Sequence, residues 1–271
     1  METIAIANSK GGTAKTTTAV SLAGVWSQAG LRVRLIDLDP EAWLSKWIAG
    51  DGADDGKGLA EALMEAAEGR EVTAELAASL VRPSVVPNVE IIAAGRWLGR
   101  AERTITTEAW AQQALARVLT QLPVDGVDLT MVDCPRAAGL LTVLALVAAG
   151  WFLVPVEAQA MALGGVKSLM ELVGQVRDNL NPKLRELSVV PCRAERTVLA
   201  RDVVAALRQR YGALVSQTVI RAGVRVAEAP SHKLPITMYE PDSGVAADYR
   251  ALAVELAPRL GLEMRAHAAE A

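Results

Sequence analysis

Short apolar runs alternate along the chain with longer segments whose apolar residues recur every three or four positions. The short runs predict buried strands, and the longer segments predict amphipathic helices. We expect strands at 3–7, 33–36, 89–93, 129–132, 152–156, 187–190 and 217–220. Helices are expected at 15–29, 58–67, 107–121, 139–148, 163–179, 200–210 and 244–259. This alternation predicts an α/β fold, with a mainly parallel sheet flanked by helices on both faces.

One segment is apolar enough to be considered as a membrane span. Residues 137–154 carry no charged side chain, and a helix of that length can cross a bilayer. Gly150 and Pro155 interrupt the segment, and residues 151–154 have the composition of a short buried strand. A helix followed by a strand buried between helix layers gives the same hydropathy, so we expect this arrangement and no membrane span.

Length and composition restrict the organisation of the chain. It has 271 residues, enough to bury a large core, and a net charge of −3. Because the strand and helix pattern continues without a Pro/Ser-rich linker, we expect one domain over residues 1–262. Residues 263–271 are small and polar and are expected to form a disordered tail. The chain begins with a strand rather than a signal peptide, which favours a cytoplasmic location.

The candidate chemistry begins directly after the first apolar run. A glycine pair, two lysines and hydroxyl residues follow it, in the order Lys10, Gly11, Gly12, Thr13, Ala14, Lys15, Thr16 and Thr17. Backbone N–H groups of a glycine turn at the start of a helix can converge on phosphate oxygens. Lys15 would then reach the β- and γ-phosphates, and the Thr16 hydroxyl could ligate Mg²⁺. The segment therefore predicts a phosphate-binding loop over residues 10–17.

Carboxylates follow two other predicted strands. Asp37 and Asp39 come after the strand at 33–36, and Asp133 ends the strand at 129–132. Ligands of open parallel sheets bind at the carboxyl ends of the strands, where these side chains are expected. An apolar strand that ends in aspartate is also typical of a Walker B strand. Asp133 is therefore a candidate for the shell of a bound Mg²⁺ ion.

The loop departs from the standard phosphate-binding pattern, which would place glycines at positions 9 and 14 instead of Ser9 and Ala14. The lysine before the glycine pair resembles the deviant Walker A motif of the ParA/MinD ATPases. Further segments resemble ParA partition ATPases in order and spacing, namely 133–142, 148–156, 181–182, 228–232 and Pro235. The chain resembles the short, Soj-like type, for which no additional N-terminal DNA-binding domain is expected.

The resemblance implies a three-layer, P-loop NTPase-like fold and a slow ATPase that uses ATP and Mg²⁺. It implies that Lys15 grips the β- and γ-phosphates and that Thr16 and Asp133 hold Mg²⁺. Asp37 would lie near the metal shell, and Asp39 would position the attacking water.

The resemblance also implies partners. Lys10 would cross the interface of an ATP-dependent homodimer to the nucleotide of the other copy. Arg196 and Arg225 align with arginines that bind double-stranded DNA nonspecifically in this family. Residues 193–233 carry eight Lys/Arg and three acids, and this local charge of +5 supports such a surface. A ParB-like centromere-binding partner would stimulate hydrolysis, and the protein would associate with the nucleoid while it segregates or positions chromosomal or plasmid DNA.

Four departures from the family pattern lie near these positions. Ala14 replaces the usual glycine of the loop, Glu41 stands where glutamine is usual, and Arg136 replaces a proline after the Walker B strand. Residues 221–223, which begin with Arg221, replace a Pro-Arg-Asn stretch in the region of base recognition. None of these changes removes a phosphate ligand.

Three other functions share parts of this pattern. A MinD-like membrane-associated ATPase needs an amphipathic C-terminal helix, but residues 259–271 offer three large apolar groups and no aromatic one, so we expect no membrane association. An iron–sulfur reductase needs two exposed cysteines per chain, whereas Cys134 and Cys192 follow predicted strands without metal-ligand spacing. A ParA-like positioner of non-DNA cargo shares the whole ATPase machinery and stays open as an alternative.

Overall fold

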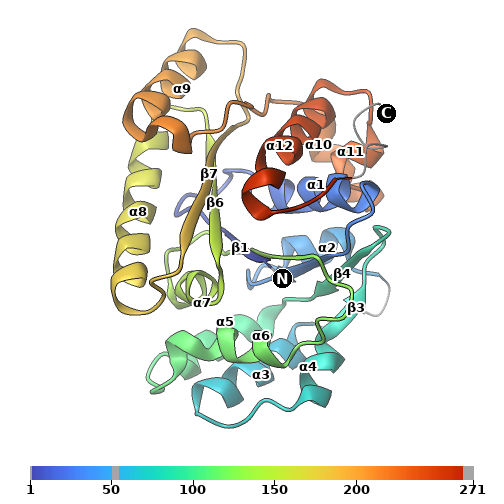
Figure 1. The fold of residues 1–271 in the computed structure, drawn as a ribbon, viewed down its shortest axis with the longest axis vertical. Helices are drawn as coiled ribbons and strands as arrows, with labels where there is room; N and C mark the ends of the chain where they lie inside the picture. Colours follow the sequence, from blue (N-terminus) through green and yellow to red (C-terminus); the bar gives the residue numbers. More distant parts are fainter. Residues whose placement is uncertain (1, 51–54, 265–271) are drawn as a thin grey trace.

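The computed structural model describes residues 2–50 and 55–264, in which seven strands form one sheet (Figure 1). The strands are β1 Glu2–Ile6, β2 Val33–Asp37, β3 Val81–Pro83, β4 Val89–Ile92, β5 Leu129–Asp133, β6 Trp151–Glu157 and β7 Arg185–Cys192. They lie in the order β3-β4-β2-β5-β1-β6-β7, and every neighbouring pair is parallel except β3 and β4. The predicted mainly parallel sheet is confirmed.

Helices cover both faces of this sheet and complete a three-layer architecture (Figure 1). They are α1 Lys15–Gln28, α2 Trp43–Ile48, α3 Lys57–Ala67, α4 Ala74–Leu80, α5 Arg96–Ile105, α6 Ala114–Gln121, α7 Leu140–Ala148, α8 Ala162–Asn179, α9 Val198–Tyr211, α10 Arg225–Glu228, α11 Ile236–Tyr239 and α12 Gly244–Leu260. Buried side chains of α1, α2, α11 and α12 pack on one face, and those of α3 to α9 pack on the other. The flanked sheet therefore has the three layers of a P-loop NTPase-like fold.

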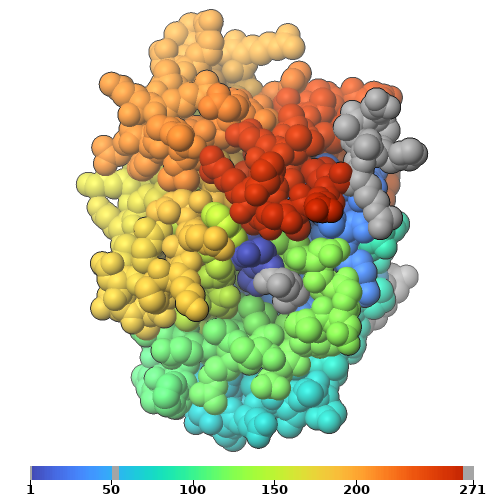
Figure 2. Space-filling model, in the orientation of Figure 1, coloured from blue at the N-terminus to red at the C-terminus, as the bar shows by residue number. Residues whose placement is uncertain are grey.

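The inner strand β1 and the residue after it show how the sequence pattern produces two cores. Ile4 and Ile6 belong to the cluster under α1 and α12, whereas Ala5 and Ala7 belong to the cluster under α7. Successive side chains of a strand point to opposite faces, so one apolar run serves both layers. In the space-filling view the dark blue atoms of the start of the chain show as a small patch between the yellow α8 region and the red α12 region (Figure 2).

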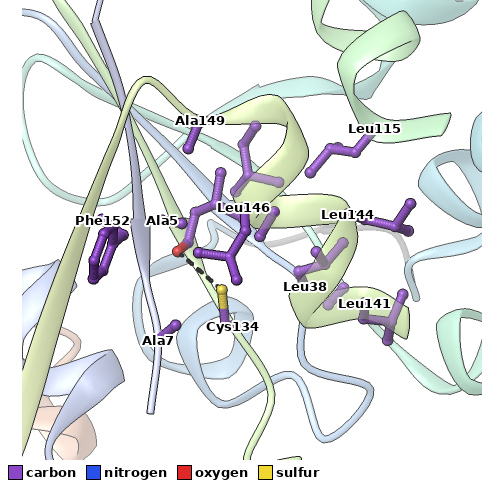
Figure 3. Close-up of a cluster of buried hydrophobic side chains, with 14 of the residues drawn as sticks. Ala5, Ala7, Leu38, Leu115, Cys134, Leu141, Leu144, Leu146, Ala149 and Phe152 are labelled. Atoms are coloured by element: carbon purple, nitrogen blue, oxygen red, sulfur yellow. Dashed lines mark hydrogen bonds between the residues drawn. The ribbon is translucent and has the colours of Figure 1, made fainter. Parts of the chain in front are cut away.

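The charge-free segment 137–154 forms α7 and the start of β6, as expected. Figure 3 shows α7 with Leu141, Leu144 and Leu146 among side chains of the sheet and of α6. Within residues 2–50 and 55–264, every helix is too short or too polar to cross a bilayer. The high hydropathy of this segment thus reflects burial between the layers of the fold.

Two sequence expectations were wrong in detail. Residues 217–220 do not form a strand, although Ile220 donates its N–H to the Pro191 carbonyl of β7 at 2.9 Å. Isolated bridges flank the segment, between Val215 and Val189 and between Arg221 and Ala194. Pro191 of β7 has no N–H to donate, which interrupts a ladder at this edge. The helix expected over 107–121 begins only at Ala114, because the Trp110 N–H bonds the carbonyl of Ala67 instead of continuing a helix.

Further elements were not expected from the sequence. The short edge strand β3 and the helices α2, α4, α5, α10 and α11 lie in stretches where the apolar pattern is brief. Of the expected tail, residues 265–271 lie outside the described residues. Met264 lies within them and packs against the core cluster that includes α12.

Candidate nucleotide-binding site

The loop that follows β1 is anchored to the neighbouring strand β6. Asn8 donates from Nδ2 to the Pro155 carbonyl at 2.7 Å, and its Oδ1 accepts the Lys10 N–H at 3.1 Å. Ala14 and Gly12 both have left-handed backbone, with φ of 69° and 77°. Lys15 then begins helix α1, so the N–H groups of its first turn face the loop.

Sheet order brings the predicted carboxylates to this loop. Strand β5 lies between β2 and β1, and its Asp133 pairs in register with Asp37 on one side and Ile6 on the other. The Thr16 hydroxyl donates to Asp133 Oδ2 at 2.6 Å. The Lys15 ammonium donates to the Lys10 carbonyl at 3.4 Å. The residues that the sequence predicted as one phosphate and metal site therefore converge in space.

Burial dominates the electrostatics of this cluster. Burial, with the nearby charge of Asp37, raises the pKa of Asp133 to about 8. Burial lowers the pKa of Lys15, partly offset by the charge of Asp133. Asp133 Oδ1 is buried and has no hydrogen-bond partner among the described residues. An orphaned carboxylate oxygen beside a threonine hydroxyl is the donor chemistry that a hard divalent cation such as Mg²⁺ prefers, so the residues fit this ion.

Asp37 and Asp39 take different positions at the end of β2. Asp37 Oδ2 accepts both the N–H and the hydroxyl of Ser45, at 2.8 and 2.7 Å, and its Oδ1 accepts the Asp39 N–H at 3.0 Å. Burial still raises the pKa of Asp37 to about 6. Asp39 lines the cleft, and its Oδ1 accepts the Glu41 N–H at 2.9 Å. Asp37 thus holds the loop after β2 in place, while Asp39 faces the candidate site.

A cleft of about 1110 Å³ extends from the phosphate loop toward α12. The loop residues form one end, and apolar side chains such as Ile220, Val226 and Pro230 form the other. Cavities of a few hundred to a thousand Å³ with an apolar wall and few polar groups are typical small-molecule sites. The dimensions and the two unlike ends suit a nucleotide, with phosphates at the loop and the base at the apolar end.

Three of the four departures from the family pattern meet partners within the fold. Arg136 Nη2 lies 2.8 Å from Glu41 Oε2, so two unusual residues form an ion pair across the cleft edge. Arg221 donates to Asp248 from its backbone N–H and its guanidinium, at distances of 2.8 to 2.9 Å. The fourth departure, Ala14, makes the first turn of α1 start from a left-handed alanine.

The candidate DNA-binding residues lie apart from the phosphate cluster. Arg196 is exposed in the loop between β7 and α9. Arg225 is exposed on α10, and its Nη1 lies 2.7 Å from Glu228 Oε2. Hydrogen bonding to Glu228 raises the pKa of Arg225. Neither residue lines the cleft that contains the phosphate loop.

Two charged residues near the loop were missed in the sequence reasoning. Glu157 ends β6, and Arg193 directly follows β7, so both lie at the carboxyl edge of the sheet with the loop. The strand-end rule that found Asp133 could have found Glu157. Arg193 was counted only as part of the basic segment. The cysteines give no exposed thiol, because Cys134 and Cys192 are both buried and burial raises the pKa of each.

Comparison with known proteins supports the resemblance. A family profile described as an AAA domain matches residues 1–186. The chromosome-partitioning ATPase Soj of Thermus thermophilus is 38% identical over 95% of this chain and 96% of its own length. The sporulation initiation inhibitor protein Soj of Bacillus subtilis is 32% identical, over 94% and 97%. A crystal structure of cobyrinic acid a,c-diamide synthase from Mycobacterium smegmatis, with bound ATP analog and magnesium, superimposes with a TM-score of 0.80 at 28% identity, covering 97% of this chain and 98% of that one.

Proposed function

The chain belongs to the ParA/Soj family of P-loop ATPases, and we propose that it is an ATP-operated switch that dimerises, binds double-stranded DNA and positions it in the cell. The convergence of Lys15, Thr16 and Asp133 at one sheet edge carries this proposal. ATP hydrolysis resets the switch, and DNA binding places the protein on the nucleoid.

The phosphate loop binds ATP through backbone N–H groups and through Lys15. Thr16 and Asp133 would hold Mg²⁺, and Asp37 fixes the adjacent loop through Ser45. Mg²⁺, when bound, neutralises charge on the β- and γ-phosphates. Asp39 orients the attacking water at the cleft. The ATP analog and magnesium in the related mycobacterial structure support this ligand choice.

ATP binding drives dimerisation in this proposal. Lys15 already serves the phosphates of its own chain, which leaves Lys10 for the nucleotide of a second copy. ATP and Mg²⁺ should shift the protein from monomer to dimer, and Lys10→Ala should abolish the shift. Sedimentation with a non-hydrolysable analogue measures this; a wild-type protein that stays monomeric contradicts the dimer.

The ATP-bound dimer binds DNA without sequence preference. The exposed positions of Arg196 and Arg225 support this, and dimerisation doubles the number of such cations. The experiment compares binding to two unrelated duplexes with ATP or ADP, for the wild type and Arg225→Glu. We expect tight binding only with ATP, equal on both duplexes and weakened by Arg225→Glu.

Other outcomes of that experiment would redirect the proposal. Equal binding with ATP and ADP contradicts the switch, and unchanged binding by Arg225→Glu contradicts the surface. An ATP-dependent dimer that binds neither duplex would be a positioner of another cargo. A ParB-like partner should accelerate a hydrolysis rate that is well below about 10 s⁻¹ in its absence.

A further inference from the structure

Glu157 joins two cations at the carboxyl edge of the sheet. Its side chain is only 8% exposed. Its Oε2 lies 3.6 Å from Lys10 Nζ, and its Oε1 lies 3.1 Å from Arg193 Nη1. One buried carboxylate therefore holds a cation from the phosphate loop and a cation from the end of β7.

Arg193 also touches the phosphate loop itself. Its Nη1 donates to the Gly12 carbonyl at 3.1 Å, although the two residues are 181 positions apart in the sequence. Gly12 belongs to the glycine pair, and Arg193 lines the same cleft as Thr13 and Lys15. The guanidinium therefore lies at the phosphate end of the cleft.

The backbone at Arg193 supports a functional position. Its φ is 52°, in the left-handed region that residues with a Cβ rarely adopt. The next residue, Ala194, donates its N–H to Ile220, which fixes the chain just after this turn. Such conformations persist where the surrounding structure enforces them, and they concentrate at binding and catalytic sites.

Part of the guanidinium is left for a ligand. Both contacts described use Nη1, and Nε and Nη2 have no partner among the described residues. The side chain is 57% exposed. A planar arginine fork can donate two hydrogen bonds to one phosphate group, which suits these remaining donors to an anion in the cleft.

The charge balance favours the same ligand. Lys10 and Arg193 carry two positive charges and Glu157 one negative charge, so the cluster has a surplus of one positive charge beside the loop. A structural ion pair would need one cation only. In the monomer this surplus lies beside the loop, and Glu157 still pairs with Arg193 when Lys10 turns to the nucleotide of a second copy.

We propose that Arg193 is a second phosphate-binding cation of this site, positioned over the loop by Glu157. It donates to non-bridging oxygens of the β- or γ-phosphate of a nucleoside triphosphate. This role rests on the proposed function, because it requires a nucleotide at the loop. Arg193 is then a nucleotide-binding residue and not one of the candidate DNA-binding residues of segment 193–233.

Nucleotide titration of Arg193→Ala tests the role. ATP affinity should fall about tenfold, because one charge-assisted hydrogen bond to phosphate is removed. Affinity for AMP, which lacks the β- and γ-phosphates, should stay at the wild-type value. Arg193→Lys should restore part of the ATP affinity because it keeps the charge. Arg185→Ala is the matched control, because Arg185 is the first residue of β7, at the end of this strand that lies away from the loop. This variant should leave the affinities for ATP and AMP unchanged.

Each other result contradicts a specific statement. Unchanged ATP affinity in Arg193→Ala overturns the role of Arg193. An equal loss for ATP and AMP shows a structural contribution and also overturns it. If Arg193→Ala does not fold, Arg193→Lys decides: a loss of affinity confined to ATP supports the role, and an ATP affinity that falls no more than the AMP affinity overturns it. Failure of the wild type to bind ATP, or wild-type binding by Lys15→Ala, would instead overturn the proposed function.

Discussion

The phosphate loop and the basic segment 193–233 both concentrate positive charge, but the fold treats them differently. In the loop, Lys15 and Thr16 face one cleft, and Asp133 from a neighbouring strand meets them there. In the basic segment, the fold sends the arginines to different places. Their contacts are Arg193 to Gly12, Arg208 to Gln217, Arg221 to Asp248 and Arg225 to Glu228.

This difference shows what local charge can predict. A phosphate loop works through its own backbone and through side chains a few residues apart. Most residues of such a site are therefore neighbours in the sequence. A charged segment becomes a binding surface only if its side chains share one face. Here Arg196 is exposed outside the cleft, whereas Arg193 and Arg221 line the cleft, although both side chains are more than half exposed. The local charge of +5 therefore overstates the outward basic surface.

The largest effect is expected from Lys15→Ala. Removing a buried cation that binds phosphate should cost about 3 kcal/mol, a loss of at least about a hundredfold in ATP affinity. Titration with labelled ATP measures it. Lys167→Ala on the exposed side of α8 is the control and should bind normally. Wild-type ATP affinity in Lys15→Ala would contradict the statement that the loop concentrates its charge on one phosphate site.

Asp39→Ala should separate binding from hydrolysis. Among the described residues the carboxylate forms no salt bridge with Lys10 or Lys15, although its charge raises the pKa of Lys15, so ATP binding and dimerisation should persist. Turnover should fall by at least about a hundredfold, the usual contribution of a positioned base. Phosphate release under saturating ATP measures this, with the exposed Asp178→Ala as control. Normal turnover in Asp39→Ala would show that another residue orients the attacking water.

Two ion pairs made by arginines of the basic segment should differ in their contribution to stability. Asp248 is buried and accepts three hydrogen bonds from Arg221, so Asp248→Ala should lower the free energy of unfolding by about 1 kcal/mol after solvent screening. Arg225→Ala removes an ion pair at the surface and should leave the denaturation midpoint unchanged. Urea unfolding compares the two; equal midpoints would remove the structural role given to Arg221.

Arginines of the basic segment should differ in their effect on the salt dependence of DNA binding. DNA affinity falls as salt rises, and the slope of log affinity against log salt concentration counts the neutralised phosphates. Arg196→Ala should make this slope shallower by about one for each phosphate contact that a protomer loses. Arg221→Ala should leave that slope unchanged, because its guanidinium is engaged with Asp248. A salt series on one duplex with ATP measures both variants. Identical slopes for the two would mean that the segment acts as one surface after all.

The smallest effect is expected inside the loop. Ala14 has a φ of 69°, where a Cβ costs about 1–2 kcal/mol and glycine costs none. Glycine also gains freedom in the unfolded chain, so Ala14→Gly should raise stability by only about 0.5 kcal/mol. Thermal unfolding of the protein without nucleotide measures the change. A loss of stability would show that alanine is favoured at this turn.

The apolar pattern was sufficient for most of the fold. It predicted six of the seven observed strands and the long helices, because each buried element needs its own apolar run. It was wrong at 217–220, where Pro191 on the neighbouring strand cannot donate to a ladder. It also missed the edge strand β3, the ten-residue helix α5 and the short helices α2, α4, α10 and α11, which depend on contacts with distant segments.

The sequence by itself determined the phosphate loop, since glycines, lysine and hydroxyl residues that act together are adjacent there. It also determined the strand ends that carry Asp37 and Asp133. Only the tertiary structure decided which distant charges meet, as in Glu157 with Arg193 and Lys10. The physical reason is that an ion pair depends on direction and distance in space. Strand order sets both. The sequence specifies the charge of each residue, but the fold specifies where its side chain points.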